Sequence, residues 1–531
     1  MPSSGLNPWG AWGAEPSTSG GSGGSSPRTG TVDKTRGSGE DAKQALGYFL
    51  PPPEARMRQH DRLYIGGEWV APAGTGTIDV VSPHTEEVIG RVPEATPADV
   101  DRAVAAAREA FDNGPWPRMD PAERRAVVGR LTALFGERMQ DMAELITEEM
   151  GSPISFSQLG QTGQALAVYG YFSELDVPWE EERAGMLGPV TVRREPVGVV
   201  AAIVPWNVPQ FIIALKLAPA LVAGCTIVIK PAPETPLDAY PLAEMLTEAG
   251  VPKGVVSIVA AGRETGEHLV RHPGVDKVAF TGSTAAGRRI GAICGEQLKR
   301  CTLELGGKSA AIICDDADLD ATMGWLKLAS LMNNGQACIA QTRVLASRGR
   351  YDEVVGALTE TVRGMRVGDP ADPATEIGPL VAARQRERVE NYIRIGQDEG
   401  AKVALGGAGR PYDRGWYVTP TVFAGVSNDM RIAREEIFGP VLTVIPYEDE
   451  DDAVRIANDS DYGLAGTVWT ADADHGLDIA RRVRTGTYGV NTYMIESSSP
   501  FGGYKSSGVG RELGPEGLSA YLEYKSIARL A

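Results

Sequence analysis

The sequence predicts an α/β protein that contains two parallel sheets and a separate small β flap. Short apolar runs alternate with helical patterns between residues 199 and 280, and again between 309 and about 490. Strands that alternate with helices form parallel sheets, whose ligands bind at the carboxyl ends of the strands. Two further segments, 186–196 and 520–530, alternate apolar and polar residues without a nearby partner, which predicts a flap used for subunit contact.

The overall charge excludes two classes of partner. The 531 residues include 52 basic and 69 acidic side chains, so the net charge is −17 and the pI is near 5.0. A protein this acidic is repelled by nucleic acid and by anionic membranes. No run approaches the ~20 apolar residues that cross a bilayer. We therefore expect neither a nucleic-acid partner nor a membrane.

The cysteines and histidines indicate a reducing compartment and no metal site. The five cysteines are odd in number and scattered along the chain, which suits a cytoplasmic protein. The five histidines form no cluster with cysteine or carboxylate at metal-ligand spacing. The start of the chain has no charged segment followed by an apolar run, so we expect no secretory signal.

The first 56 residues differ in composition from the rest of the chain. Residues 1–56 are rich in glycine, serine and proline and have no periodic apolar face, which predicts a disordered tail. Folded structure is expected from Met57, with a hairpin over 64–70. Thr96 and Asp120 are each followed by proline and, three residues on, by an acid, which predicts two helix starts.

Three turns with polar residues follow predicted strands and are expected at one sheet edge. The strand 199–204 leads to Trp206 and Asn207, and the strand 226–229 leads to Lys230. The strand 277–280 opens into a glycine turn. A helix start there can bind phosphate through backbone N–H groups, although an ordinary turn would have the same pattern. Likewise, the Lys230 side chain could be exposed to solvent or could bind a nucleotide.

Three side chains have the chemistry that covalent catalysis requires. Cys338 follows a glycine turn, where an exposed thiol can act as a nucleophile, although a lone cysteine is more often a small buried hydrophobe. Glu304 lies in an apolar run, where burial would raise its pKa into the range of a general base. The Asn207 amide could face an oxyanion or could simply form a turn.

Together these segments resemble the aldehyde dehydrogenase superfamily, in its NAD(P)-dependent, non-acylating branch. The resemblance extends from about Leu63 to Leu530, and Glu304 and Cys338 have a separation similar to that in the family. It rests on five motifs: Phe280–Thr284, Leu303–Lys308, Gly335–Cys338, Glu436–Pro440 and Pro500–Lys505.

The resemblance implies a division of the chain into domains. It implies a Rossmann-like coenzyme-binding domain over 57–177 and 197–304, an α/β catalytic domain over 305–519, and oligomerisation segments at 178–196 and 520–531. A homodimer or homotetramer is expected on the same grounds.

The resemblance also implies a mechanism. Cys338 would attack the aldehyde to form a thiohemiacetal, whose oxyanion is held by Asn207 and the Cys338 backbone N–H. Hydride would pass to the cofactor, and Glu304 would activate the water that hydrolyses the remaining thioester. The cofactor would contact Trp206, Lys230, Gly282, Ser283, Gly287, Leu305, Glu436 and Phe438.

Apolar positions beside these motifs predict an apolar substrate channel: Val208, Ile212, Leu215, Met332, Ala337, Ile339, Tyr493 and Met494. None of them could clamp a carboxylate, so aliphatic or aromatic aldehydes are expected. Glu496 leaves an amino-aldehyde, as in a betaine-aldehyde-like enzyme, as an alternative. A non-catalytic structural relative is a further alternative, which the intact Cys338 and Glu304 disfavour.

One position departs from the family pattern. NAD-preferring members usually carry glutamate three residues after the lysine, where it binds the adenosine ribose. Here that position is Pro233, and Glu234 is displaced by one residue. NAD remains the expected cofactor, and NADP becomes possible because Pro233 replaces the usual glutamate.

Overall fold

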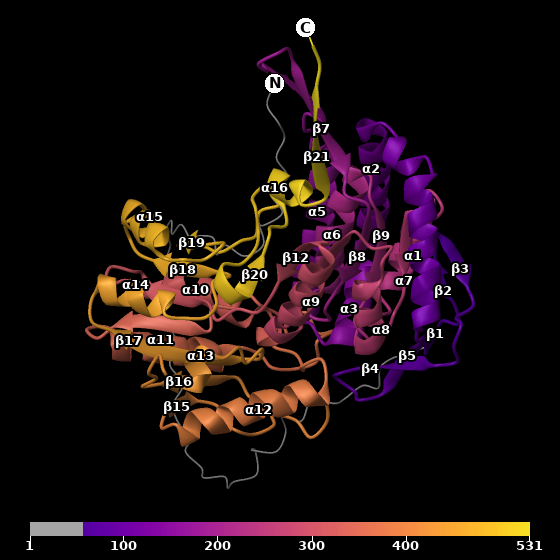
Figure 1. The fold of residues 1–531 in the computed structure, drawn as a ribbon. Helices are drawn as coiled ribbons and strands as arrows, with labels where there is room; N and C mark the ends of the chain where they lie inside the picture. Colours follow the sequence, from indigo (N-terminus) through magenta and orange to yellow (C-terminus); the bar gives the residue numbers. More distant parts are fainter. Residues whose placement is uncertain (1–56, 531) are drawn as a thin grey trace, which may run out of the picture. The chain divides into compact units, whose positions relative to one another are not determined.

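A computed structural model of the chain describes residues 57–530, so the expected disorder of residues 1–56 lies outside the described residues. The predicted α/β class is confirmed (Figure 1). The described part contains one sheet of eight strands, one of seven and two of three. The domain boundaries expected from the resemblance stay a prediction.

The first large sheet is parallel in its centre and antiparallel at its edges. β12, β11, β8, β9 and β10 run parallel, and β20 and the β2–β3 hairpin pair antiparallel at either side. In spatial order the strands are β20 (Gly508–Val509), β12 (Arg300–Glu304), β11 (Lys277–Thr281), β8 (Val199–Ile203), β9 (Thr226–Lys230), β10 (Val256–Ile258), β2 (Leu63–Ile65) and β3 (Glu68–Val70).

Helices cover both faces of this sheet because its central strands are apolar on both sides. Val200 and Ala202 pack against one helix layer, whereas Val199 and Ala201 pack against the other. The first layer contains α2 (Pro121–Glu137), α3 (Met139–Met150), α5 (Gln164–Glu174), α6 (Pro209–Ala223) and α7 (Ala239–Glu248). The second contains α1 (Pro97–Asp112), α8 (Arg263–Arg271) and α9 (Thr284–Gln297).

The two predicted helix starts are confirmed by their caps. The Thr96 backbone N–H donates to the Asp99 carboxylate at 2.9 Å, and the Asp120 carboxylate accepts from the Ala122 N–H at 2.8 Å. Between α3 and α5 the chain forms the short helix α4 (Ile154–Phe156) and a π-helix over Ser157–Gly163, which sequence periodicity did not predict.

The second large sheet has the same layered construction. Its strands, in spatial order, are β15 (Lys402–Leu405), β16 (Thr421–Ala424), β17 (Val441–Tyr447), β14 (Arg343–Ser347), β13 (Ala310–Ile313), β18 (Gly466–Trp469) and β19 (Gly489–Val490). The helices α10 (Leu319–Leu331) and α11 (Tyr351–Gly364) cover one face. The other face packs against α12 (Ala383–Asp398), α13 (Arg431–Arg434), α14 (Glu450–Asn458) and α15 (Ala473–Arg482).

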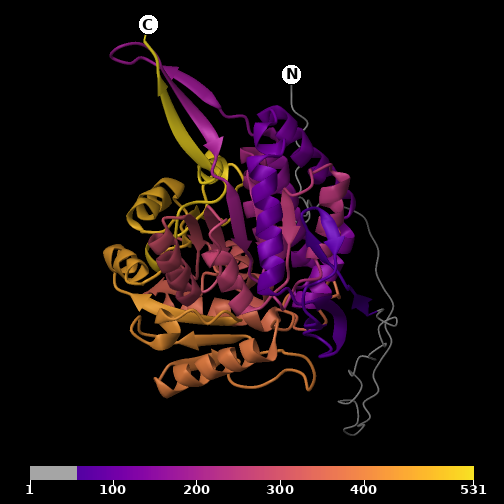
Figure 2. The ribbon, with the colours of Figure 1, turned by 45° about the vertical axis from the view of Figure 1, so that its right-hand side comes forward.

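The two alternating segments pair with each other, as predicted. β7 (Val190–Pro196) runs antiparallel to β21 (Leu522–Ala528) on one side and to β6 (Glu180–Arg183) on the other. This flap projects from the first sheet, with β21 following the short helix α16 (Gly514–Ser519) (Figure 2). A second small sheet contains β1 (Arg58–Gln59), β5 (Val88–Pro93) and β4 (Thr77–Val81).

Candidate active site

The carboxyl ends of the central strands of the first sheet lie side by side. In the parallel register, Thr281 lies opposite Glu304 and Ile203 lies opposite Lys230. The turns that follow β8 and β11 therefore emerge at the same edge, where ligands of parallel sheets bind. The Gly282 N–H also donates to the Glu304 carbonyl at 3.0 Å, so the glycine turn is fixed to the end of β12.

Cys338 reaches this edge through a left-handed turn at the end of α10. Asn333, Asn334 and Gly335 have φ angles of 55°, 63° and 73°. A Cβ on Gly335 would lie 2.4 Å from the Gly439 carbonyl, so only glycine allows this close approach. The turn therefore brings the cysteine beside the loop that contains Glu436 and Phe438.

The surroundings of the Cys338 thiol favour its protonated form. Burial raises its pKa to about 12, and the carboxylates of Glu436 and Glu304 add to the effect. The thiol is therefore protonated at neutral pH. Because the thiolate is the nucleophilic form, attack on a carbonyl at this site requires a base that removes the proton.

Glu304 is a buried carboxyl group whose charge acts on the Cys338 thiol, and it has the properties of a base. Its side chain is 3% exposed, and neither oxygen has a hydrogen-bond partner of normal geometry among the described residues. Burial and the charge of Glu512 raise its pKa well above the usual range. A Cβ on Gly502 would lie 2.6 Å from Glu304 Oε1, so glycine leaves room for the carboxyl group.

A buried ion pair beside Glu304 was missed by sequence analysis. Lys216 Nζ of α6 lies 2.7 Å from Glu512 Oε1 and donates to Thr281 Oγ1 at 2.6 Å. The charge of Lys216 lowers the pKa of Glu304, whereas that of Glu512 raises it. Lys216 lies in an otherwise apolar run of the sequence, which forms the buried helix α6. A lysine in such a run is a sequence signal that could have revealed a buried ion pair.

Asn207 lies next to the cysteine turn and is tied to it. Its side chain is 4% exposed, and its Nδ2 donates to the Gln336 carbonyl at 3.0 Å. One amide N–H is therefore used on the backbone two residues before Cys338. No other acceptor for this amide is found among the described residues, so its second N–H is available to a ligand oxygen.

The glycine turn after β11 fits an anionic group. Ser283 caps α9, its hydroxyl accepting from the Ala286 N–H at 3.3 Å, and the first N–H groups of a helix attract phosphate. A Cβ on Gly287 would lie 2.4 Å from the Leu305 side chain, so Leu305 packs directly against the turn. Gly282 is similarly close to the Phe280 ring.

The other predicted cofactor residues lie in two places around this edge. Lys230 Nζ is buried and donates to the Pro231 and Ala261 carbonyls, each at 2.9 Å, and burial lowers its pKa to about 8. The alternative of a solvent-exposed lysine is therefore wrong. The Trp206 and Phe438 rings meet edge to face at 5.4 Å.

Glu436 is held beside these rings by the Gly307 N–H, which donates to its carboxylate at 3.0 Å. Burial raises its pKa. A buried acid, two aromatic rings and a helix N-terminus together fit the ribose, ring and pyrophosphate parts of a dinucleotide.

The position that departs from the family pattern has an unexpected neighbour. Glu234, the residue after Pro233, forms an ion pair with Arg384 of α12. Arg384 therefore contacts the residue next to Pro233, although it lies far from Pro233 in the sequence. Sequence analysis did not predict this arginine. Because Glu234 is paired, its carboxylate is already engaged in this structure.

Seven of the eight predicted channel residues pack in one apolar cluster with Cys338. They are Val208, Ile212, Leu215, Met332, Ala337, Ile339 and Tyr493. Met494 is instead 37% exposed and lies outside the cluster, in which Ile495 and Phe501 take part. Burial alternates over 493–495 and leaves Met494 exposed; because all three residues are apolar, the sequence did not predict this. Glu496 is exposed.

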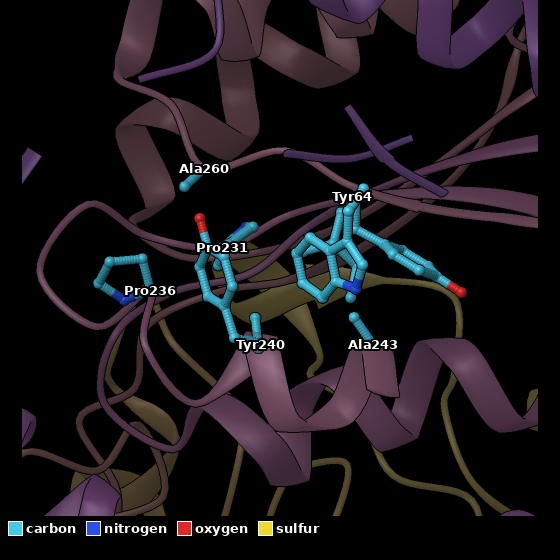
Figure 3. Close-up of a pocket in the computed structure, with 9 residues that line it drawn as sticks. Tyr64, Pro231, Pro236, Tyr240, Ala243 and Ala260 are labelled. Carbon is cyan, nitrogen blue, oxygen red and sulfur yellow. The ribbon is translucent and has the colours of Figure 1, made fainter. Parts of the chain in front are cut away.

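A small aromatic pocket lies away from these residues, on the β10 side of the first sheet. Figure 3 shows Tyr240 projecting from α7 between Pro236 and Tyr64. The Tyr240 ring stacks on Trp69 at 5.4 Å and on His60 at 3.8 Å. None of the predicted catalytic side chains lines this pocket, although Pro231, which accepts from Lys230, does.

Within 57–530, no three or more histidine, cysteine, aspartate or glutamate side chains are grouped so that they could hold a metal ion. In the same part of the chain, no helix is long and apolar enough to cross a membrane.

The fold and the residues at the sheet edge define a class of protein. It is an α/β enzyme in which one sheet edge fits a dinucleotide, and a second sheet domain brings a cysteine to that edge. The aldehyde dehydrogenase family model matches residues 69–527. A geranial dehydrogenase of Castellaniella defragrans is 50% identical over 471 residues, which cover 88% of this chain and 98% of the relative.

Solved structures of aldehyde dehydrogenases are similar to this chain in both fold and sequence. An aldehyde dehydrogenase of Mycobacterium tuberculosis complexed with NAD+ is 51% identical, with a TM-score of 0.88 over 89% of this chain and 99% of that one. An aldehyde dehydrogenase of Pseudomonas syringae, solved with NAD+ and octanal, is 40% identical, with a TM-score of 0.85 over 90% of this chain and 97% of that one. The chain belongs to the aldehyde dehydrogenase family. It is an NAD(P)-dependent oxidoreductase that acts on aldehydes.

Proposed function

We propose that this enzyme oxidises apolar aliphatic or aromatic aldehydes to carboxylic acids by covalent catalysis at Cys338. The observation that carries the proposal is the meeting, at one edge, of a thiol, an amide with a free N–H and a buried carboxyl group that lacks a hydrogen-bond partner of normal geometry among the described residues. Bound NAD accepts the hydride. The roles of the three side chains follow from their surroundings.

In the first half of the reaction, Glu304 or a water next to it takes the proton of Cys338, because the thiol does not ionise unaided at neutral pH. The sulfur then bonds to the aldehyde carbon. The free N–H of Asn207 and the Cys338 backbone N–H hold the oxyanion, and one such donor contributes about 10²–10³ in rate. Loss of hydride leaves a thioester on Cys338.

Glu304 releases the thiol proton to solvent before the second half. It then removes a proton from water, which attacks the thioester carbon. The carbon–sulfur bond breaks, the carboxylic acid leaves, and Cys338 regains its proton. The raised pKa of Glu304 makes it a stronger base than an ordinary carboxylate. The cluster of apolar side chains around Cys338 limits access of other water to the thioester.

The channel predicts the substrate class. We expect kcat/KM for octanal or benzaldehyde to exceed that for succinic semialdehyde at least about tenfold, because an unpaired carboxylate is costly in an apolar channel. Steady-state rates with a panel of aldehydes test this. The Glu496→Gln variant is the control, since an exposed Glu496 should not change the order. If a semialdehyde acid or a cationic amino-aldehyde gave the highest kcat/KM, this substrate class would be wrong.

A second prediction concerns the cofactor. The Pro233 side chain cannot accept a hydrogen bond from the ribose, nor repel a 2′-phosphate, so discrimination against NADP should be weak. Pro233→Glu is expected to raise the NAD over NADP ratio in kcat/KM by roughly tenfold, through one charge-assisted hydrogen bond of ~1.5–3 kcal/mol that is partly realised. Glu234→Gln is the matched control. Because Glu234 is paired with Arg384, it should change the ratio less than about twofold. The opposite pattern would show that Glu234 is the ribose ligand.

Assembly and location also remain proposals. Exposed apolar side chains on the flap, Met186, Leu187 and Ile527, support a homodimer or homotetramer formed through it. All five cysteines are free, which supports a reducing, cytoplasmic compartment.

A further inference from the structure

Two adjacent asparagines in the turn before Cys338 have the same backbone conformation but different partners. Asn333 and Asn334 both have left-handed φ angles and are 1% and 0% exposed. Residues held in this conformation cluster at functional sites, where surrounding contacts determine them. Asparagine tolerates it better than most residues, so both could serve the turn alone. Their hydrogen bonds distinguish them.

Asn334 anchors the turn to the rest of the protein. Its Nδ2 donates to the Gly151 and Pro379 carbonyls at 2.9 and 2.8 Å, and its Oδ1 accepts from the Gly378 N–H at 2.6 Å. None of these three partners belongs to the proposed catalytic group. Asn334 therefore stabilises the turn without reaching Asn207 or Cys338.

Asn333 instead joins two parts of the proposed catalytic group. Its Nδ2 donates to the Asn207 backbone carbonyl at 2.8 Å and to the Gln336 carbonyl at 3.2 Å. The Gln336 carbonyl also accepts from the Asn207 side chain at 3.0 Å. The three residues form a closed set of hydrogen bonds, in which one carbonyl accepts from two amides and one amide bridges two backbones.

This arrangement has a geometric consequence. Both amide hydrogens of Asn333 are used on carbonyls, which fixes the separation between the Asn207 backbone and the backbone two residues before Cys338. The Asn207 side chain then places one N–H on Gln336, which leaves the other for the proposed oxyanion. Gln161, from the π-helix, gives the Asn207 carbonyl only a long further contact of 3.4 Å. Asn333 therefore supplies the shorter of the two side-chain hydrogen bonds to that carbonyl.

We infer that Asn333 is a positioning residue that sets the distance and direction of the Asn207 oxyanion donor relative to Cys338. The inference rests on the proposed roles of Cys338 and Asn207. A misplaced donor loses much of its effect on the transition state while substrate and cofactor still bind, because Asn333 is not among the residues proposed to hold either of them.

The test compares matched pairs of variants. Asn333→Gly and Asn334→Gly both keep the left-handed turn, since glycine adopts it without strain, and each removes one amide. Asn333→Asp and Asn334→Asp are nearly isosteric and replace the amide donor by a carboxylate. We expect the Asn333 variants to lower kcat about 10- to 100-fold, with the aldehyde KM and the NAD Kd changed less than about threefold. The Asn334 variants should lower the melting temperature at least as much but kcat less than about threefold.

A double-mutant cycle with Asn207→Ala separates positioning from a general structural role. If Asn333 acts through Asn207, Asn333→Gly should lower kcat less than about threefold in the Asn207→Ala background. Equal losses in both backgrounds, or equal kcat losses for Asn333 and Asn334 variants, would overturn the inference. Full activity in Asn207→Ala would instead show that Asn207 does not have the proposed oxyanion role, which is a separate result from a failure of the positioning inference.

Discussion

Replacing Cys338 by alanine is expected to abolish aldehyde oxidation while NAD still binds. The sulfur forms the bond to substrate in both halves of the proposed reaction, and the dinucleotide edge is built from other residues. Residual activity should be below about one hundredth of the wild-type rate, because covalent catalysis contributes more than that. The measurements are the rate of aldehyde-dependent NADH formation and the quenching of tryptophan fluorescence by NAD.

Cys314→Ala is the matched control for this variant. Cys314 is also partly buried, and burial likewise raises its pKa to about 12. It follows β13 of the second sheet and belongs to a different apolar cluster from Cys338. Its replacement should leave kcat within about twofold. If Cys338→Ala kept more than a hundredth of the activity, or if Cys314→Ala lost as much as Cys338→Ala, Cys338 would not be the nucleophile.

Glu304→Gln is expected to block hydrolysis of the thioester more than transfer of hydride. Removing a general base should lower steady-state kcat by about 10²–10⁴. The glutamine is isosteric and uncharged, and the buried site already disfavours the charged form of Glu304, so the melting temperature should not fall. Stopped-flow absorbance should show a first, fast phase of NADH followed by slow turnover.

The pH dependence of these variants adds a second criterion. Because the pKa of Glu304 is raised, the basic form becomes more abundant as pH rises, and hydrolysis in the wild type should become faster with it. In Glu304→Gln this rise should be absent. Wild-type turnover in Glu304→Gln, or an unchanged rise of hydrolysis with pH, would show that another group activates the water.

The fold class could be predicted because the spacing of apolar residues and the residues that cap helices are local features of the sequence. Alternation of apolar runs with helices indicated the parallel sheets, and the caps at Thr96 and Asp120 fixed two helix starts within the sequence itself. The π-helix over 157–163 could not be predicted, because the change in hydrogen bonding along this short segment produces no distinct spacing of apolar residues in the sequence.

The site was predictable where a residue's chemistry conflicted with its surroundings. Glu304 was identified by its apolar neighbours in the sequence, and the structure places it buried without a hydrogen-bond partner of normal geometry among the described residues. Lys216 with Glu512 and Glu234 with Arg384 could not be paired, since each pair joins residues far apart in the chain. The left-handed turn could be predicted in part, since Asn-Asn-Gly is a run of residues that tolerate positive φ.

The central claim is that oxidation proceeds through an acyl group on Cys338, and one measurement tests it most directly. Glu304→Gln is mixed with octanal and NAD, quenched in acid during the slow phase, digested and analysed by mass spectrometry. The account predicts that the peptide containing Cys338 gains the mass of octanal less two hydrogen atoms, in an amount equal to the NADH of the fast phase. NADH formation with no such adduct, or with the adduct on another cysteine, would contradict it.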